Sequence, residues 1–309
     1  MAKLYQYLNQ LLVESTKTIL RQILQRYINK LRDFNELVMF EHSIFSLPFI
    51  FIAMIVAADG WFGFGLLLLG ALAAVSARNF AMGLNRFADR DIDAQNPRTS
   101  SRPNVDGRID ASSILIFTLV NAFAFVGVAY IINPLAFVLS FPILLILGSY
   151  SYFKRFSSLA HIVLGVSLGL APIAGVVAVS AEITVWSVLL SLGVLFWVAG
   201  FDLLYSLQDM EFDKERGLHS IPSKYGVQTT LLLSALFHIL TIVFWALFVW
   251  VAGLGFFANM AVVLGAVMLS YEHYLVRKDF TKIDRAFFTV NGYLGILFFI
   301  LIVMDKVLS

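Results

Sequence analysis

Long apolar stretches constrain the fold of this chain more than any other feature. A helix needs about 20 mostly apolar residues to cross a lipid bilayer, and nine stretches come close to or exceed that length. None alternates polar and apolar residues with a period of two, so the pattern predicts helices rather than a barrel. Only 14% of the residues are charged, against about 25% in soluble domains. The sequence therefore predicts an all-α membrane protein with nine transmembrane helices. The predicted spans are residues 43–59, 62–84, 111–132, 134–153, 159–180, 184–206, 228–253, 255–275 and 287–305.

The basic residues predict how these helices are oriented. All but two of the 22 Lys and Arg residues lie before the first span or in the loops that follow spans two, four, six and eight. With nine spans these five segments share one side of the membrane. Because Lys and Arg collect on the cytoplasmic side, we expect the N-terminus and these loops in the cytoplasm. The exceptions are Arg78, within the second span, and Lys306, on the opposite side.

Residues 1–40 differ from the rest of the chain. They mix Leu, Ile and Tyr with six basic residues, which are Lys3, Lys17, Arg21, Arg26, Lys30 and Arg32. This pattern predicts an amphipathic cytoplasmic segment that lies on the membrane surface, followed by a transmembrane domain at 41–309. A partly disordered tail is the alternative. The segment has no short apolar core followed by a cleavage site, so we expect no cleavable signal peptide. The absence of cysteine excludes disulfides and thiolate metal sites.

Two acidic motifs follow apolar spans on the predicted cytoplasmic side. The first consists of Asn85, Asp89 and Asp93, and the second of Asp202, Tyr205, Asp209 and Asp213. Side chains four apart lie on one face of a helix. Each motif ends an even-numbered span, and four spans separate the two, which suggests an internal repeat with the motifs facing each other. A coincidental match of two segments is the alternative.

The residue types of the motifs predict a magnesium–diphosphate site. Mg²⁺ prefers oxygen ligands and binds through one or two carboxylates, with water and substrate phosphates completing its shell. Bare carboxylates would repel a diphosphate, so we expect two Mg²⁺ ions to bridge them. The expected metal ligands are Asn85, Asp89, Asp93, Asp209 and Asp213. The Tyr205 hydroxyl should reach the same cavity, and the intervening Asp91 and Glu211 should point elsewhere.

Cations of the same loops are candidates to bind the remaining phosphate charge. They are Arg86, Arg98, Arg102, Lys154 and Arg155, although topology alone also explains basic residues there. For the acceptor substrate the candidates are Arg78, because a cation within a span needs a partner, and His42. Arg78 could instead reach the interface and pair with a loop acid, and His42 could cap a helix.

On these motifs the chain resembles the UbiA superfamily of intramembrane aromatic prenyltransferases. The motifs Asn-x-x-x-Asp-x-x-x-Asp and Asp-x-x-Tyr-x-x-x-Asp-x-x-x-Asp are similar to the family's two signatures, and the likeness covers about residues 35–305. It extends to Asn96-Pro-Arg98-Thr-Ser-Ser-Arg102-Pro, to Tyr150-x-x-x-Lys154-Arg155 and to Ser220-Ile-Pro-Ser-Lys-Tyr-Gly226.

The resemblance implies nine helices around a central cavity, with a cytoplasmic cap formed by the 2–3 and 6–7 loops. It also implies that all seven motif residues are catalytic. The implied reaction is Mg²⁺-dependent transfer of a polyprenyl group from polyprenyl diphosphate to an aromatic acid in a bacterial inner membrane, with no nucleic-acid partner. The second motif is most similar to the 4-hydroxybenzoate polyprenyltransferase branch, which starts the ubiquinone pathway. The prenyltransferase of the futalosine-type menaquinone pathway shares this pattern, and a haem- or chlorophyll-type acceptor is a third option.

A secondary transporter is the alternative from another class of function. Many spans, a possible repeat and intramembrane charge would all allow it. Transporter sites lie near the bilayer midplane on interrupted helices, whereas these acids lie at the predicted cytoplasmic ends of the spans. The position of the motifs therefore favours the enzyme.

Overall fold

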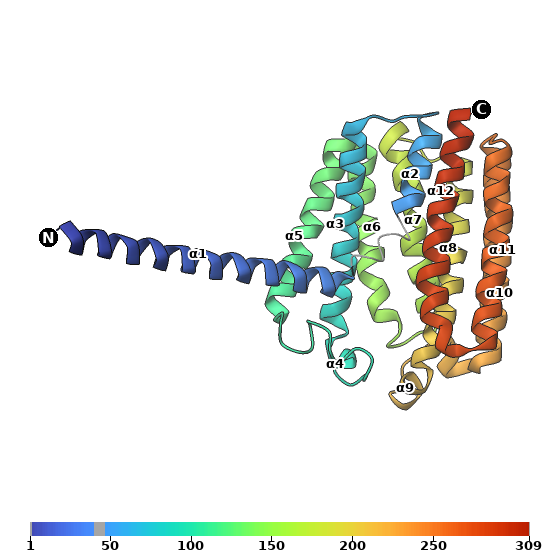
Figure 1. Cartoon of the computed structure of the whole chain (residues 1–309). Coiled ribbons are helices and arrows are strands. Elements are labelled where there is room, and N and C mark those ends of the chain that lie inside the picture. The colour runs from blue at the N-terminus through green and yellow to red at the C-terminus, as the bar shows by residue number, and fades with distance from the viewer. Residues whose placement is uncertain (1, 40–46, 309) are drawn as a thin grey trace.

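The chain folds into a bundle of helices from which one long helix projects (Figure 1). The computed structural model describes residues 2–39 and 47–308, with side chains described from residue 16 onward, and it contains no strand in these residues. The projecting helix is α1 (Ala2–Val38). The bundle helices are α2 (Leu47–Ala57), α3 (Phe64–Ala88), α5 (Ala111–Ile132), α6 (Pro134–Phe153), α7 (Ala160–Ser180), α8 (Val185–Ser206), α10 (Ile221–Val251), α11 (Phe256–Lys278) and α12 (Asn291–Leu308). Two short helices, α4 (Arg90–Asp93) and α9 (Met210–Glu215), lie in loops.

The long bundle helices confirm a multi-pass membrane protein. Eight helices of the described chain are long and apolar enough to cross a membrane. The span predicted at 43–59 corresponds to α2, which has 11 described residues and covers only about 16 Å, half the thickness of a bilayer core. Residues 43–46 lie outside the described residues. The span predicted to begin at 228 is extended, because α10 begins at Ile221 and has a kink at Gly226.

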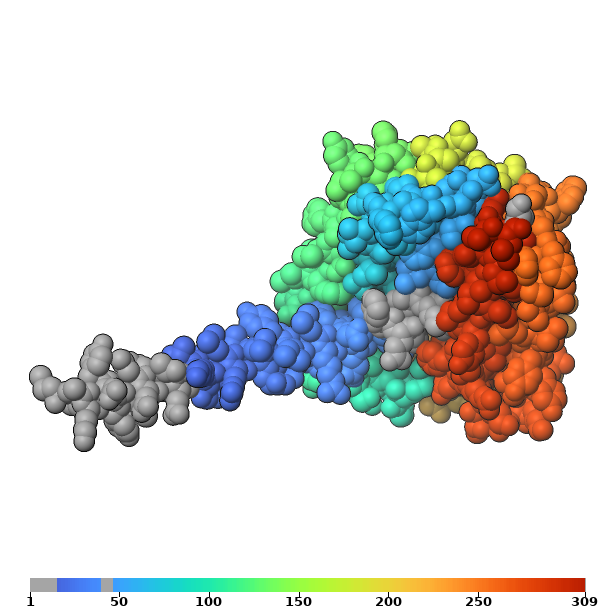
Figure 2. Space-filling model, turned by 45° about the horizontal axis from the view of Figure 1, so that its top comes forward, coloured from blue at the N-terminus to red at the C-terminus, as the bar shows by residue number. Residues whose placement is uncertain are grey.

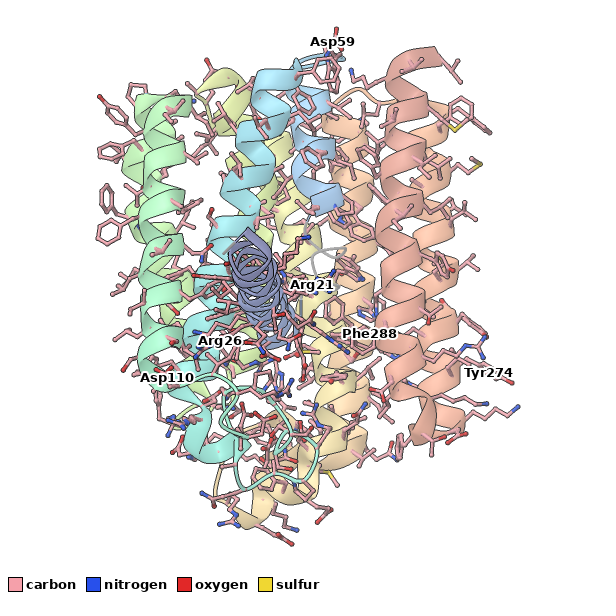
Figure 3. All side chains as sticks on the ribbon, turned by 60° about the vertical axis from the view of Figure 1, so that its left-hand side comes forward. Arg21, Arg26, Asp59, Asp110, Tyr274 and Phe288 are labelled. Carbon is pink, nitrogen blue, oxygen red and sulfur yellow. The ribbon has the colours of Figure 1, made fainter. Side chains whose placement is uncertain are left out.

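The two ends of the bundle differ in the way the basic residues predict. Both α4 and α9 lie at the lower end in Figure 1, which we call the motif end because both acidic motifs reach it. At the opposite end Lys306 pairs with Asp59, with 2.6 Å between Nζ and Oδ1, and Figure 3 labels Asp59 there. The expected separation of the basic loops from Lys306 is therefore present in the fold.

The bundle has a packed half and a hollow half. Large aromatic side chains of α2, α8, α10 and α12 fill the packed half, where Phe49, Trp197, Trp245 and Phe298 are each at most 1% exposed. A cavity of about 580 Å³ occupies the other half and is lined by residues of α2, α3, α5, α6, α7 and α8. The cavity reaches from both acidic motifs, at Asn85 and Tyr205, toward the other end of the bundle.

Two glycines of α7 bring helix backbones into direct contact. A Cβ atom at Gly165 would clash with the Leu195 carbonyl oxygen of α8. A Cβ atom at Gly175 would lie 2.6 Å from the Ile50 carbonyl oxygen of α2. Small residues allow this approach, on which packing between membrane helices depends because lipid removes the hydrophobic driving force. The wall of the cavity formed by α2, α7 and α8 is therefore tightly sealed at these positions.

The predicted N-terminal segment is helical over its described length. Figure 2 shows α1 extending away from the bundle, and in this view no other segment covers most of the helix. Its last residues pack on the bundle, where Phe34 stacks on Phe117 of α5 at 4.9 Å between ring centroids and Leu37 is buried with Ile109 and Ile114.

Candidate active site

The first motif lies where α3 ends. The helix stops at Ala88, Asp89 adopts φ −96° and ψ 8°, and α4 begins at the next residue. The N–H of Asp89 still donates to the Asn85 carbonyl at 2.8 Å, and the N–H of Asp93 to the Asp89 carbonyl at 2.8 Å. The three side chains therefore keep a helix-like stacking although the regular helix is interrupted.

The second motif has the same interruption at the corresponding residue. After α8 the chain forms a 3₁₀ turn (η2, Leu207–Asp209), and Asp209 adopts φ −100° and ψ 4° before α9 begins. Each motif therefore runs across a break in its helix, at Asp89 and at Asp209. The shared break at the second-to-last aspartate of each motif supports an internal repeat.

The carboxylates of the first motif are buried and paired with cations. Asp89 is 2% exposed and Asp93 is 4% exposed. Lys154 Nζ lies 2.7 Å from Asp89 Oδ2, and Asn85 Nδ2 donates to the same oxygen at 2.8 Å. Arg102 Nη1 lies 2.8 Å from Asp93 Oδ1. Cations of two loops thus neutralise carboxylates that burial would otherwise make unfavourable.

Asp89 has spare capacity to bind a ligand. Its Oδ1 atom is buried without a hydrogen-bond partner, which is unusual for a buried polar atom and calls for an explanation. Burial raises the pKa of the Asp89 carboxyl above its ordinary value, and the Lys154 ammonium opposes the rise. An additional cation at Oδ1 would favour the charged carboxylate in the same way.

The second motif contacts the 2–3 loop directly. Arg98 binds both oxygens of Asp209, with Nε 3.0 Å from Oδ1, and Asn96 Nδ2 donates to Asp209 Oδ1 at 3.0 Å. Arg98 Nη1 also donates to the Tyr205 hydroxyl at 3.1 Å. The Phe287 ring packs against the Tyr205 ring, with 4.3 Å between the ring centroids. The structure therefore brings residues of the loop after α3 onto the second motif.

The remaining carboxylates of the second motif have partners that sequence reasoning did not identify. His161 Nδ1 lies 2.7 Å from Asp202 Oδ2, and Ser220 opposes the rise in the pKa of the Asp213 carboxyl that burial causes. In the first motif, Asn104, which is fully buried, is a further partner that sequence reasoning did not identify, and it donates to Asp93 Oδ2 at 3.2 Å. A polar residue just inside an apolar span, as His161 is, is the sequence signal that could have identified one of them.

The remaining candidate phosphate ligands surround the same place. Arg155 bonds the exposed Asp91, at 2.8 Å from Nη2 to Oδ1, and lies 3.7 Å from Asp89. Arg86 is buried, donates from Nε to the Leu37 carbonyl at 3.1 Å, and has Nη1 4.0 Å from Asp93 Oδ2. All five predicted cations therefore lie within one cluster at the motif end.

Of the two candidate residues for binding the acceptor, the described chain includes only Arg78. Arg78 lines the cavity and donates to the Val38 carbonyl at 2.8 Å, while its Nη1 is buried without a partner. His42 lies outside the described residues.

The site suits a magnesium ion that shares its coordination with a substrate. No three Asp, Glu or His side chains of the described chain form a complete metal site. The ligands present include a buried carboxylate oxygen without a hydrogen-bond partner, and Mg²⁺ usually takes one or two carboxylates and leaves other positions to water and phosphate. Asp89 fits such a position, and Asp93 and Asp209 stay predicted ligands.

Comparison with known proteins agrees with this geometry. The sequence is 29% identical over 257 residues to a 4-hydroxybenzoate octaprenyltransferase of Saccharophagus degradans, covering 82% of this chain and 85% of that protein. The fold matches the apo structure of a UbiA homologue from Aeropyrum pernix K1 with a TM-score of 0.77 and 31% identity, covering 86% of this chain and 98% of that one. A UbiA homologue from Archaeoglobus fulgidus bound to GPP and Mg²⁺ shares the fold, with a TM-score of 0.70 and 20% identity, over 87% of this chain and 99% of that one.

The family assignment rests on most of the sequence as well as on the motifs. Residues 46–302 match the UbiA prenyltransferase family, and this range contains both acidic motifs and every helix of the bundle except the last six residues of α12. The chain therefore belongs to the UbiA prenyltransferase family.

Proposed function

We propose that this enzyme transfers a polyprenyl group from a polyprenyl diphosphate to 4-hydroxybenzoate, in a Mg²⁺-dependent reaction of ubiquinone biosynthesis. The new carbon–carbon bond forms ortho to the phenol hydroxyl as the carbon–oxygen bond to the diphosphate breaks. The electron pair of that bond leaves with the diphosphate, and the ring proton is lost to a base.

The single observation that carries the proposal is the junction of the cation–carboxylate cluster with the apolar cavity. Asn85, Arg86, Asp202 and Tyr205 line the cavity at one end, and apolar side chains line most of the rest. A diphosphate at this end and an isoprenoid tail along the cavity would match both surfaces.

The cations of the cluster can bind the diphosphate. Arg98, Arg102 and Lys154 now pair with Asp209, Asp93 and Asp89. When Mg²⁺ is bound it supplies charge that stabilises the leaving diphosphate. The three basic side chains can then bind phosphate oxygens in place of the aspartates. Each basic side chain therefore keeps an anionic partner throughout.

Aromatic residues border the place where the prenyl carbon would lie. Tyr205 and Phe287 line the cavity beside the motif, and Phe201 packs edge-on against Phe287 at 5.1 Å. Aromatic faces stabilise a nearby positive charge, here the charge that develops on the prenyl carbon as the diphosphate leaves. The apolar wall excludes water that would otherwise react with that carbon. Asp202, one oxygen of which is held by His161, is the candidate to accept the ring proton.

The acceptor assignment is supported by Arg78 and by the relatives. Arg78 lines the cavity and has a buried Nη1 without a hydrogen-bond partner, so its guanidinium could bind a benzoate carboxylate. The Saccharophagus protein bears the name 4-hydroxybenzoate octaprenyltransferase. By analogy with such bacterial relatives and from the basic loops, we infer a bacterial inner-membrane location with the motif end in the cytoplasm.

A membrane assay tests the reaction and the metal together. The purified enzyme in lipid nanodiscs should transfer labelled polyprenyl diphosphate to 4-hydroxybenzoate, lose activity with EDTA and regain it with Mg²⁺. Asp209→Asn should abolish turnover, because it removes a motif carboxylate with little change in shape. The matched control is Glu211→Gln, since Glu211 is exposed two residues away and should keep normal turnover.

The acceptor is tested in the same assay by competition. Offered 4-hydroxybenzoate, a naphthoate and futalosine-derived acceptors, the enzyme should prenylate 4-hydroxybenzoate fastest. A preference for a futalosine-derived acceptor would move the enzyme to the menaquinone pathway, and resistance to EDTA would refute the metal assignment.

A further inference from the structure

The projecting part of α1 carries an apolar stripe. Seven large apolar side chains are 47–71% exposed in the folded chain. They are Ile19, Leu20, Ile23, Leu24, Tyr27, Ile28 and Leu31. Their spacing alternates between one and three residues, which places them on one side of a helix with about 100° per residue. We call this set the apolar stripe.

The apolar stripe continues directly into the packing of the bundle. Phe34 and Val38 follow Leu31 on the same side of α1. Phe34 stacks on Phe117 of α5, and Val38 is 4% exposed. One face of α1 is therefore covered by protein at its end, and the described residues leave the same face uncovered along the stripe.

α1 joins the bundle near the motif end of the spans. Arg86, which donates to the Leu37 carbonyl, lies two residues before the end of α3, or about 3 Å along that helix. Phe117 lies six residues after the start of α5, or about 9 Å. An interfacial helix buries its apolar face about 5–10 Å into the boundary between headgroups and acyl chains, and these contacts lie at a comparable distance from the ends of α3 and α5.

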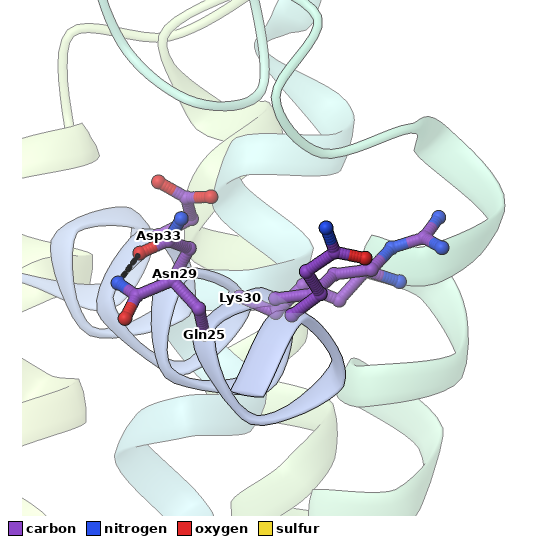
Figure 4. Close-up of a pocket in the computed structure, with 6 residues that line it drawn as sticks. Gln25, Asn29, Lys30 and Asp33 are labelled. Atoms are coloured by element: carbon purple, nitrogen blue, oxygen red, sulfur yellow. Dashed lines mark hydrogen bonds between the residues drawn. The ribbon is translucent and has the colours of Figure 1, made fainter. Parts of the chain in front are cut away.

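The opposite face of α1 is polar and points to the motif end. Arg108 of the 2–3 loop binds Glu36, with 2.6 Å from Nη1 to Oε2, and Asp33 at 3.3 Å. Figure 4 shows the shallow surface pocket on this side, where Gln25 Nε2 donates to Asn29 Oδ1 at 3.1 Å. The ion pairs of Arg108 with Glu36 and Asp33 fix the rotation of α1 about its axis. The apolar stripe, on the opposite side of α1, therefore faces away from the motif end and toward the membrane interior.

Basic residues border the apolar stripe along both edges. Arg21 and Arg26 lie about 140° apart around the helix, and Figure 3, which looks along α1, shows them on opposite sides of it. Arg32 shares the side of Arg21, and Lys30 shares the side of Arg26. This arrangement places positive charge at headgroup level on either side of the inserted face.

We propose that α1 docks on the lipid surface of the leaflet at the motif end. The apolar stripe lies among acyl chains, and Arg21, Arg26, Lys30 and Arg32 contact anionic phospholipid headgroups, which attract basic residues near a membrane surface. Docking fixes the end of α1, where the Val38 carbonyl accepts a hydrogen bond from Arg78 beside the cavity.

The proposal is tested with spin labels on the full-length protein. Because the chain has no cysteine, Tyr27→Cys and Asn29→Cys each give a single labelling site, on opposite faces of one helical turn. In nanodiscs containing phosphatidylglycerol, the label at position 27 should relax faster with oxygen than with a water-soluble nickel chelate. The label at position 29 should show the reverse.

The charge component has its own comparison. Replacing Arg21, Arg26, Lys30 and Arg32 together by Gln should bring the label at position 27 closer to water. The labelled protein with all four basic residues should show the same change in discs of phosphatidylcholine alone. An equal depth of the label at position 27 in both lipids would refute the contact with anionic headgroups.

Two other outcomes would overturn the proposal. If both labels were equally open to the nickel chelate, α1 would lie in water. If the label at position 27 were shielded from oxygen and nickel and broadened by the label of another molecule, a second copy of the chain would cover the apolar stripe. Neither outcome depends on enzyme activity.

Discussion

Lys154 offers a test in which two measured quantities should move in opposite directions. Its ammonium lies 2.7 Å from Asp89 Oδ2, on a carboxylate that we expect Mg²⁺ to use. Removing the charge in Lys154→Met should strengthen metal binding to the substrate-free enzyme, because the ion no longer competes with the lysine. The same change should weaken binding of the prenyl diphosphate, because a phosphate ligand is lost.

The geometry sets the size of the effect. Two unit charges 2.7 Å apart attract by about 6 kcal/mol at an effective dielectric constant of 20 and by about 1.5 kcal/mol in water. The Lys154 side chain is 32% exposed and that of Asp89 is 3% exposed, so the lower part of this range applies. A charged hydrogen bond contributes about 1.5–3 kcal/mol, which corresponds to a roughly ten- to hundredfold change in affinity.

Manganese is a suitable probe for the metal arm. Titration of the substrate-free enzyme with Mn²⁺, followed by the EPR signal of the free ion, should show tighter binding in Lys154→Met than in the wild type. Steady-state turnover with labelled prenyl diphosphate should show a KM higher by a similar factor. Arg90→Met is the matched control, because it removes one positive charge from an exposed position beside Asp89.

The reasoning fails if the two quantities move together. Unchanged metal affinity in Lys154→Met would mean that the lysine does not compete at Asp89. An equal effect in Arg90→Met would mean that only the general charge of the loop matters, and not the contact seen in the structure.

Three further changes test other parts of the site and fold. Tyr205→Phe should lower turnover by about tenfold, since a hydroxyl hydrogen bond contributes about 1 kcal/mol or more, while thermal unfolding in detergent stays unchanged; a normal rate would make the hydroxyl dispensable. His161→Leu leaves Asp202 without its partner at 2.7 Å and should lower kcat more than it raises KM for the diphosphate; a change in KM alone would show that the pair serves only binding. Gly165→Ala should destabilise the protein by about 1–3 kcal/mol because it forces backbones apart, measured by thermal or denaturant unfolding, whereas Gly127→Ala, where a Cβ meets nothing within 4 Å, should not; equal stability of the two variants would contradict tight packing of α7.

The sequence predicts what depends on local composition. A membrane span is a run of apolar residues, so the eight long spans could be located from their own residues, and the basic loops could be assigned to one end of the bundle. The resemblance predicted the family for the same reason, because both motifs are contiguous in sequence. The predicted roles of the motif residues stay predictions.

What depends on distant contacts could not be predicted in this way. The breaks at Asp89 and Asp209 go against the helical periodicity of each motif. Loop contacts stabilise the changed direction of the chain, such as the hydrogen bond from Thr99 Oγ1 to the Asp93 carbonyl. The partnership of His161 with Asp202 joins residues 41 apart in sequence, and nothing near either residue encodes it. Likewise, the acidic residues near the end of α1 gave no sign that Arg108 would bind them.

The contacts of α7 limit where a lipid-like molecule can pass. A hydrocarbon tail is at least as thick as a methyl group, and a methyl group at Gly165 or Gly175 would already strike the neighbouring backbone. Tails therefore cannot slip past α7 on its α8 or α2 side at these levels. A tail that outgrows the chamber must leave between other helices. The product would then enter the bilayer sideways between those helices, while the released diphosphate departs into water at the motif end.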